Sequence, residues 1–132
     1  MIIRCINKLR KSERGATMVE FAIAATAFFL LFFGIIEFGW LFNGWITLNA
    51  AAREGVRLAV VEHKGNETEI KNTVKSHAPT FNLDNDNIVV TFGVMPEYKT
   101  SVKVNGNLVM PLGFFFSSPY PLEVEAHMRH ER

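Results

Sequence analysis

Glu20 is the residue of this 132-residue chain whose position most clearly requires a chemical partner. It lies in an apolar run from Ala16 to Phe42, in which only Glu20 and Glu37 are charged. An α-helix rises 1.5 Å per residue, so Glu20 lies about 6 Å from the start of that run. An ionised carboxylate in a bilayer costs about 2.5–3.5 kcal/mol at the centre and less near an end. We therefore expect a cation close to Glu20.

The apolar run does not supply this cation, because it contains no Lys or Arg. Cleavage between Gly15 and Ala16 would create one, since the new amino-terminal ammonium would lie at the start of the helix, at a similar depth. It could pair with Glu20 of the same chain or of a neighbouring chain. The alternative is a Glu20 side chain that reaches water at the cytoplasmic interface and has no special role.

The apolar run is long enough to cross a membrane. Residues 21–36 carry no charge, and about 20 apolar helical residues span a bilayer. The rest of the chain is too small to bury so long an apolar helix, which argues against the core helix of a soluble protein. A cleaved secretory signal is also disfavoured, because the apolar core is long for one. We place the transmembrane part at about residues 17–42.

The formal net charge of +1 hides two differently charged parts. Residues 1–15 carry a net charge of +4 and residues 16–132 a net charge of −3. The near-neutral total argues against a nucleic-acid partner bound through bulk positive charge. Basic flanks remain in the cytoplasm, so we expect one span with a cytoplasmic amino end and an extracytoplasmic carboxyl end. Trp40 and Trp45 would lie in the outer aromatic belt.

The segment around Glu20 resembles the processing motif of type IV prepilins. A basic leader ends in Arg14-Gly15 and is followed by Ala16-Thr17-Met18-Val19-Glu20-Phe21. The resemblance implies that a prepilin peptidase cuts between Gly15 and Ala16 and that Glu20 docks each subunit into a growing filament. The sequence departs from major type IV pilins at Ala16, where Phe or Met is frequent.

Four sequence segments, in this order along the chain, make it similar to the TadE-like family, whose members are pseudopilins of the tight-adherence (Tad/Flp) pilus. The blocks are Arg14-Gly15-Ala16-Thr17-Met18-Val19-Glu20-Phe21-Ala22, Gly34-Ile35-Ile36-Glu37-Phe38-Gly39, Asn49-Ala50-Ala51-Ala52-Arg53-Glu54-Gly55-Val56-Arg57 and the tail Glu125-Ala126-His127-Met128-Arg129-His130-Glu131. The resemblance implies a pseudopilin or minor pilin in the bacterial inner membrane that takes part in pilus assembly and adherence. Its partners would be the membrane, the prepilin peptidase, other pilins and Tad assembly components. The rival interpretation is an uncleaved single-pass anchor that presents a small extracytoplasmic binding domain.

Four charged residues of the matching blocks are candidates for an interface with other subunits. Arg53, Glu54 and Arg57 lie in the third block. Glu37 lies about 31 Å along the helix from Ala16, near the outer interface. Two interpretations of Glu37 stay open: a solvated interfacial glutamate, or a contact with another subunit or membrane component.

The patterning predicts an α+β, pilin-like fold in three parts. After a cleaved leader at 1–15, a long helix at 16–62 continues outside the membrane and packs on a small head at 63–132. A second helix begins after Asn66, which would cap it, and Pro79 ends it; Ile70, Val74 and Ala78 form its apolar face. Residues 81–87 are predicted to form a polar turn. A calcium loop is less favoured, because the segment lacks the glycine and the terminal glutamate of an EF-hand.

An antiparallel sheet should follow these helices, with strands near 88–94, 101–110 and 122–128. Asn105-Gly106 could turn a hairpin, and one bent strand is the alternative. The third segment alternates apolar and polar residues, as in a half-buried strand. For Phe114-Phe115-Phe116 we expect packing over the core rather than an exposed docking or lipid-contact patch.

Other chemistry is not indicated by the residue spacing. The histidines have no metal-ligand spacing backed by Cys or carboxylates; they are His63, His77, His127 and His130. No phosphate-binding loop, nucleophile elbow or carboxylate pair is present, and the single cysteine, Cys5, lies in the leader. We expect no catalytic role, no cofactor, no metal and no small-molecule substrate.

Overall fold

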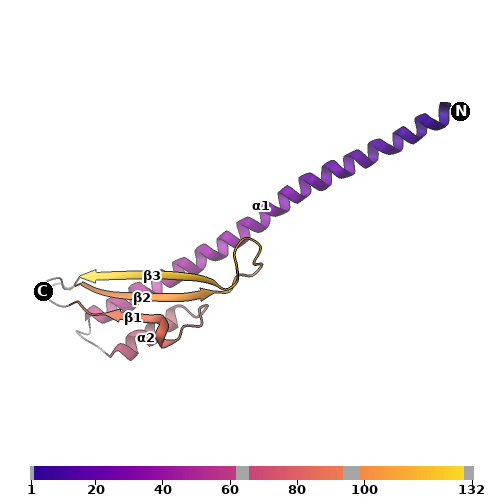
Figure 1. Cartoon of the computed structure of the whole chain (residues 1–132). Coiled ribbons are helices and arrows are strands. Elements are labelled where there is room, and N and C mark those ends of the chain that lie inside the picture. Colours follow the sequence, from indigo (N-terminus) through magenta and orange to yellow (C-terminus); the bar gives the residue numbers. More distant parts are fainter. Residues whose placement is uncertain (1, 62–65, 94–98, 130–132) are drawn as a thin grey trace. The chain divides into compact units, whose positions relative to one another are not determined.

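The computed structural model describes residues 2–61, 66–93 and 99–129, with side chains described from Gly15 onward. It confirms the α+β class: a long helix, a short helix and a three-stranded antiparallel sheet (Figure 1). The elements are α1 (Ile2–Val61), α2 (Glu67–His77), a 3₁₀ turn η1 (Asn85–Asn87), β1 (Ile88–Thr91), β2 (Lys99–Leu108) and β3 (Tyr120–Arg129). The chain divides into two compact units, Met1–Ile36 and Glu37–Arg132.

The predicted long helix is present as α1, which already begins at Ile2 and runs to Val61. No proline interrupts it, so its backbone hydrogen bonds can continue from end to end. Its polar side chains are accommodated locally: the Thr26 hydroxyl donates to the Ala22 carbonyl at 2.8 Å. The expected helix end near Glu62 lies outside the described residues.

Helix α2 presents the predicted apolar face to the core. Ile70, Val74 and Ala78 are all fully buried. Asn66 is the N-cap residue, but its side chain makes no capping hydrogen bond, so that part of the prediction is wrong. Its backbone carbonyl instead accepts from the Glu69 and Ile70 N–H groups, at 2.7 and 3.2 Å. The segment before β1 forms the turn η1, in which the Asp84 N–H donates to Asn87 Oδ1 at 2.9 Å.

The sheet has the order β1-β2-β3, and both pairs of neighbours are antiparallel. The hairpin considered at Asn105-Gly106 does not form, and the single-strand alternative is correct, because β2 runs through both residues. Gly106 pairs with Leu122 in the middle of the β2–β3 ladder. A Cβ atom at Gly106 would lie 2.6 Å from Cδ1 of the Phe81 ring. The glycine therefore allows close packing rather than a turn.

The core of the second unit joins α1, α2 and one face of the sheet. From α1 it takes small and branched residues: Leu48, Ala51, Ala52, Val56 and Ala59. Val102, Val104 and Leu108 contribute from β2, and Val124 and Ala126 from β3. The predicted alternation along β3 is confirmed from Leu122 to Ala126, where Glu123 and Glu125 are exposed. It does not extend to Met128, which is exposed as well.

The loop between β2 and β3 only partly follows the prediction that its phenylalanines pack over the core. Phe116 packs against the core cluster, but Phe114 is 70% and Phe115 44% exposed. The loop bends at Gly113, which has a φ of 63°, a conformation that favours glycine. Three consecutive side chains after such a bend fan out and cannot all point towards one core.

Replacing Gly55 by Leu should destabilise the head, since a Cβ atom there would lie 2.5 Å from Cγ2 of Val74. Overpacking of this kind costs about 1–3 kcal/mol. The matched control is Gly39→Leu in the same helix, where an added Cβ meets nothing within 4 Å. Thermal unfolding of the full chain in detergent should show a lower midpoint for Gly55→Leu only. Equal midpoints for the two variants would contradict the close packing of α1 on α2.

Candidate functional site

Glu20 lies on an exposed surface of α1 among apolar side chains. Its neighbours Met18 and Phe21 are 75% and 73% exposed. Further along the helix, towards its carboxyl end, phenylalanine rings pair one turn apart, Phe28 with Phe32 and Phe29 with Phe33, with centroids 6.3 and 6.1 Å apart. The carboxylate therefore lies near one end of an apolar surface. The run from Ala16 to Phe42 contains no Lys or Arg that could pair with it.

This part of α1 has the properties of a membrane span. The described helix from Gly15 to Val61 contains a window of mean hydropathy 2.3, none of which is buried within the protein. Such a surface is unfavourable in water and favourable in lipid. The helix is therefore long and apolar enough to serve as a membrane anchor.

Glu37, in contrast, is fully buried in the second unit. Its Oε1 accepts a hydrogen bond from the Phe114 N–H, and its Oε2 one from the Phe115 N–H, both at 2.7 Å. The interpretation of Glu37 as a solvated glutamate is wrong, because these contacts remove the carboxylate from water. A contact of Glu37 with another subunit stays a prediction. No local sequence pattern indicates these two partners, because they lie 77 and 78 residues away in the chain.

Further contacts hold residues 109–119, which we call the Glu37 loop. The indole Nε1 of Trp40 donates to the Val109 carbonyl at 3.1 Å, and the Met110 N–H donates to Ser118 Oγ at 3.2 Å. The Phe116 ring meets Phe38 edge to face, at a centroid distance of 5.3 Å. Three side chains within one turn of α1 therefore contact the loop: the Glu37 carboxylate, the Phe38 ring and the Trp40 indole.

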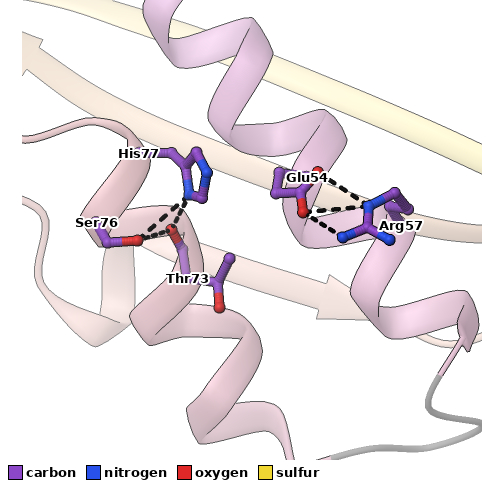
Figure 2. Close-up of polar contacts among 5 residues, drawn as sticks. All are labelled: Glu54, Arg57, Thr73, Ser76 and His77. Carbon is purple, nitrogen blue, oxygen red and sulfur yellow. Dashed lines mark hydrogen bonds and ion pairs between the residues drawn. The ribbon is translucent and has the colours of Figure 1, made fainter.

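The predicted interface residues Glu54 and Arg57 form an ion pair on α1 (Figure 2). Arg57 Nε donates to Glu54 Oε1 and Oε2 at 3.1 and 3.0 Å. This hydrogen bond from Arg57 lowers the pKa of Glu54, and His77 adds a smaller effect in the same direction. The same pair raises the pKa of Arg57. At neutral pH the site therefore presents a fixed, ionised pair.

His77 faces this pair from the last turn of α2, as Figure 2 shows. Its Nδ1 lies 2.9 Å from the Thr73 carbonyl oxygen, which also accepts from Ser76 Oγ at 2.8 Å. A carbonyl only accepts, so Nδ1 carries the proton in that contact. Arg53, the remaining predicted interface residue, is exposed on α1. Glu54 and Arg57 are thus brought together, whereas Glu20 and Glu37 occupy separate environments; subunit contacts by these residues stay predictions.

The segment that carries these features can be compared with known families. A family model described as TadE-like protein matches residues 15–57. The matched TadE-like segment is about a third of the chain and contains Glu20, Glu37, Glu54 and Arg57. This confirms the resemblance that the sequence blocks indicated.

The TadE-like match supports a minor-pilin role associated with the Tad pilus, and it suggests association with pilus components at a membrane. The apolar helix near the amino terminus is compatible with that location. No curated protein and no solved structure matches the chain. The head is therefore interpreted from its own geometry.

Glu37→Gln should loosen the Glu37 loop while leaving the shape of the side chain nearly unchanged. A buried hydrogen-bonding group that loses its partner costs about 1–3 kcal/mol, and the amide of glutamine offers only one acceptor oxygen in place of two. A loss of about 1.4 kcal/mol corresponds to a tenfold change in an equilibrium. We expect the Phe114 and Phe115 amides to exchange with deuterium about tenfold faster or more, measured on the full chain in detergent.

The control for this measurement is Glu123→Gln, which removes an exposed carboxylate that pairs with Lys103 on the sheet. It should leave exchange in the Glu37 loop unchanged. Unaltered exchange at Phe114 and Phe115 in Glu37→Gln would show that the carboxylate does not hold the loop.

Proposed function

We propose that this protein is a minor pilin or pseudopilin of a Tad (Flp) pilus that takes part in pilus assembly and adherence at the bacterial inner membrane. In this proposal the chain is the substrate of a prepilin peptidase and not itself an enzyme. The observation that carries the proposal is the TadE-like match over residues 15–57, because this segment holds both the predicted cleavage junction and Glu20. The matched segment begins at Gly15, so the basic leader lies outside it.

Charge and length support the orientation in this proposal. The leader carries a net charge of +4, which favours a cytoplasmic amino end. From Ala16 to Glu37 α1 advances about 31 Å, close to the ~30 Å thickness of the hydrocarbon core. The head that follows Glu37 would then lie outside the cytoplasm.

Cleavage and docking are linked in this proposal by electrostatics. Cutting between Gly15 and Ala16 leaves an ammonium at the helix start, about 6 Å from Glu20 along the axis. Glu20 is exposed, so it can reach the ammonium of a neighbouring chain as well as its own. An ion pair between chains, in a medium of low dielectric constant, is far stronger than the same pair in water. Exposed rings such as Phe28 and Phe29 would supply the packing surface between neighbouring helices.

The amino terminus of the mature protein is the first test. The chain isolated from cells with the prepilin peptidase should begin at Ala16, and the chain from cells without it should keep its leader. Gly15→Leu should block cleavage in cells that have the peptidase, as should any bulky side chain at the cut, so that the leader is kept in both strains. A full-length chain in both strains, or a mature end elsewhere, would favour the uncleaved single-pass anchor.

Glu20→Ala is the second test. The variant should insert and be cleaved normally, because the apolar run and the junction at Gly15 are unchanged. It should reduce piliation and the recovery of this protein with its partner subunits, since the docking carboxylate is lost. Glu69→Ala, which removes an exposed glutamate from the first turn of α2, is the matched control and should assemble normally. Normal piliation in Glu20→Ala would show that Glu20 is not the docking group.

A further inference from the structure

A small polar pocket lies on the outer face of the sheet, on the side away from the core. Its volume is about 180 Å³, and its lining includes Asn87, Asn105, Asn107, Pro121 and Glu123. Side chains alternate between the two faces of a strand, and Val104 packs in the core, so Asn105 points to the opposite face. The pocket is several times larger than the ~30 Å³ that one water takes up, and smaller than a typical drug-sized site. It therefore suits a ligand of one small ring.

Three residues of the lining form a row across the three strands. Asn105 of β2 pairs with Glu123 of β3. Asn87 directly precedes β1, and because Ile88 pairs with Val104, the antiparallel register places Asn87 beside Asn105. Neighbouring strands lie about 4.8 Å apart. The row therefore presents two amides and one carboxylate at regular intervals.

The two ends of this row are held by contacts within the head. Asn87 Oδ1 accepts a hydrogen bond from the Asp84 N–H at 2.9 Å, which fixes the amide and leaves Nδ2 to donate. Glu123 Oε1 lies 2.6 Å from Lys103 Nζ, which leaves the second carboxylate oxygen able to accept. The pocket thus has a positioned donor at one end and a positioned acceptor at the other.

Asn105, in the middle of the row, has an unpaired oxygen. Its Oδ1 is buried and has no hydrogen-bond partner among the residues that the structure describes. A buried polar group without a partner costs about 1–3 kcal/mol. Rotation of the amide about χ2, a torsion with broad preferences, would turn this oxygen towards the pocket. A ligand that donates a hydrogen bond there would therefore recover this cost.

The lining restricts the chemical class of such a ligand. It contains no Lys, Arg or His, and the Glu123 carboxylate repels anions. A divalent cation is disfavoured because this carboxylate already pairs with an ammonium and because the described residues contain no cluster of three His, Cys, Asp or Glu. An apolar ligand would leave the amides without partners. A neutral ligand whose hydroxyl groups both donate and accept satisfies all of these conditions.

We propose that this pocket binds one sugar unit, which is a neutral ring with several hydroxyl groups. One hydroxyl donates to Asn105 Oδ1, and its neighbours accept from Asn87 Nδ2 and donate to Glu123. Pro121 provides an apolar contact for the C–H groups of the ring. The inference rests on the fold of the second unit alone, so it depends neither on membrane insertion and cleavage nor on the pilin role.

The test is an NMR titration of the isotope-labelled full chain with glucose, galactose, mannose and N-acetylglucosamine. The detergent must lack a sugar headgroup, because such a headgroup would compete for the pocket. At least one of the sugars should shift the side-chain amide signals of Asn87 and Asn105 until they saturate. Absence of saturation with all four sugars would overturn the proposal, and saturation with inorganic phosphate or Ca²⁺ in their place would show an ion site instead.

Asn105→Ala should weaken the affinity for that sugar about tenfold, which corresponds to about 1.4 kcal/mol. It should not lower the midpoint of thermal unfolding, because the lost oxygen has no partner in the described part of the protein. Ser101→Ala, on the same face of β2 but outside the pocket, is the matched control and should bind like the original chain. Glu123→Gln, which replaces the acceptor carboxylate, should also weaken binding. Unchanged affinity in Asn105→Ala or in Glu123→Gln would overturn the proposed contacts.

Discussion

The change in the surroundings of α1 at Glu37 is the constraint on which the rest of the structure depends. From Gly15 to Ile36 the helix exposes almost every side chain. After it, small and branched residues such as Ala51, Ala52 and Val56 are buried against the head. One helix therefore meets two environments, and its side chains change where the environment changes. Glu37 stands at that boundary with its carboxylate turned towards the loop of the head.

Glu20 and Glu37 are both glutamates of α1, but their surroundings differ. Glu37 finds its partners within its own unit, where its two oxygens accept hydrogen bonds from two backbone N–H groups. Glu20 finds no cation along the apolar run, so in the proposed function its partner comes from cleavage and from neighbouring subunits. A carboxylate that is satisfied internally holds a structure together, whereas one that is left without a partner favours assembly. This contrast separates the structural role of Glu37 from the proposed docking role of Glu20.

Two glycines allow close packing within the head. Gly55 allows α2 to lie against α1, since a Cβ atom there would overlap Val74, and Gly106 allows the Phe81 ring to lie on the sheet. The pair of Glu54 and Arg57 lies on α1 beside His77 of α2 (Figure 2). These exposed charges add little stability, because solvent screens them.

Much of the architecture followed from the sequence because it rests on local patterns. The length of the apolar run, the period of the face of α2 and the alternation along β3 each depend on residues close together in the chain, and the TadE-like blocks are also local. The sequence misjudged features that depend on distant residues. The pair Asn105-Gly106 is typical of a hairpin turn, but β2 runs through it and the Phe81 ring packs beside Gly106. Packing over the core is the sequence-based prediction for Phe114 and Phe115, but both side chains are exposed. Glu37 was expected to meet water or another subunit, but its partners are 77 and 78 residues away. The sequence by itself determined that the chain has a helix long and apolar enough to cross a membrane, with a carboxylate near the start of its apolar run. Only the tertiary structure decided which backbone groups the second carboxylate binds and which aromatic side chains remain exposed, because these depend on how the loop folds back onto α1.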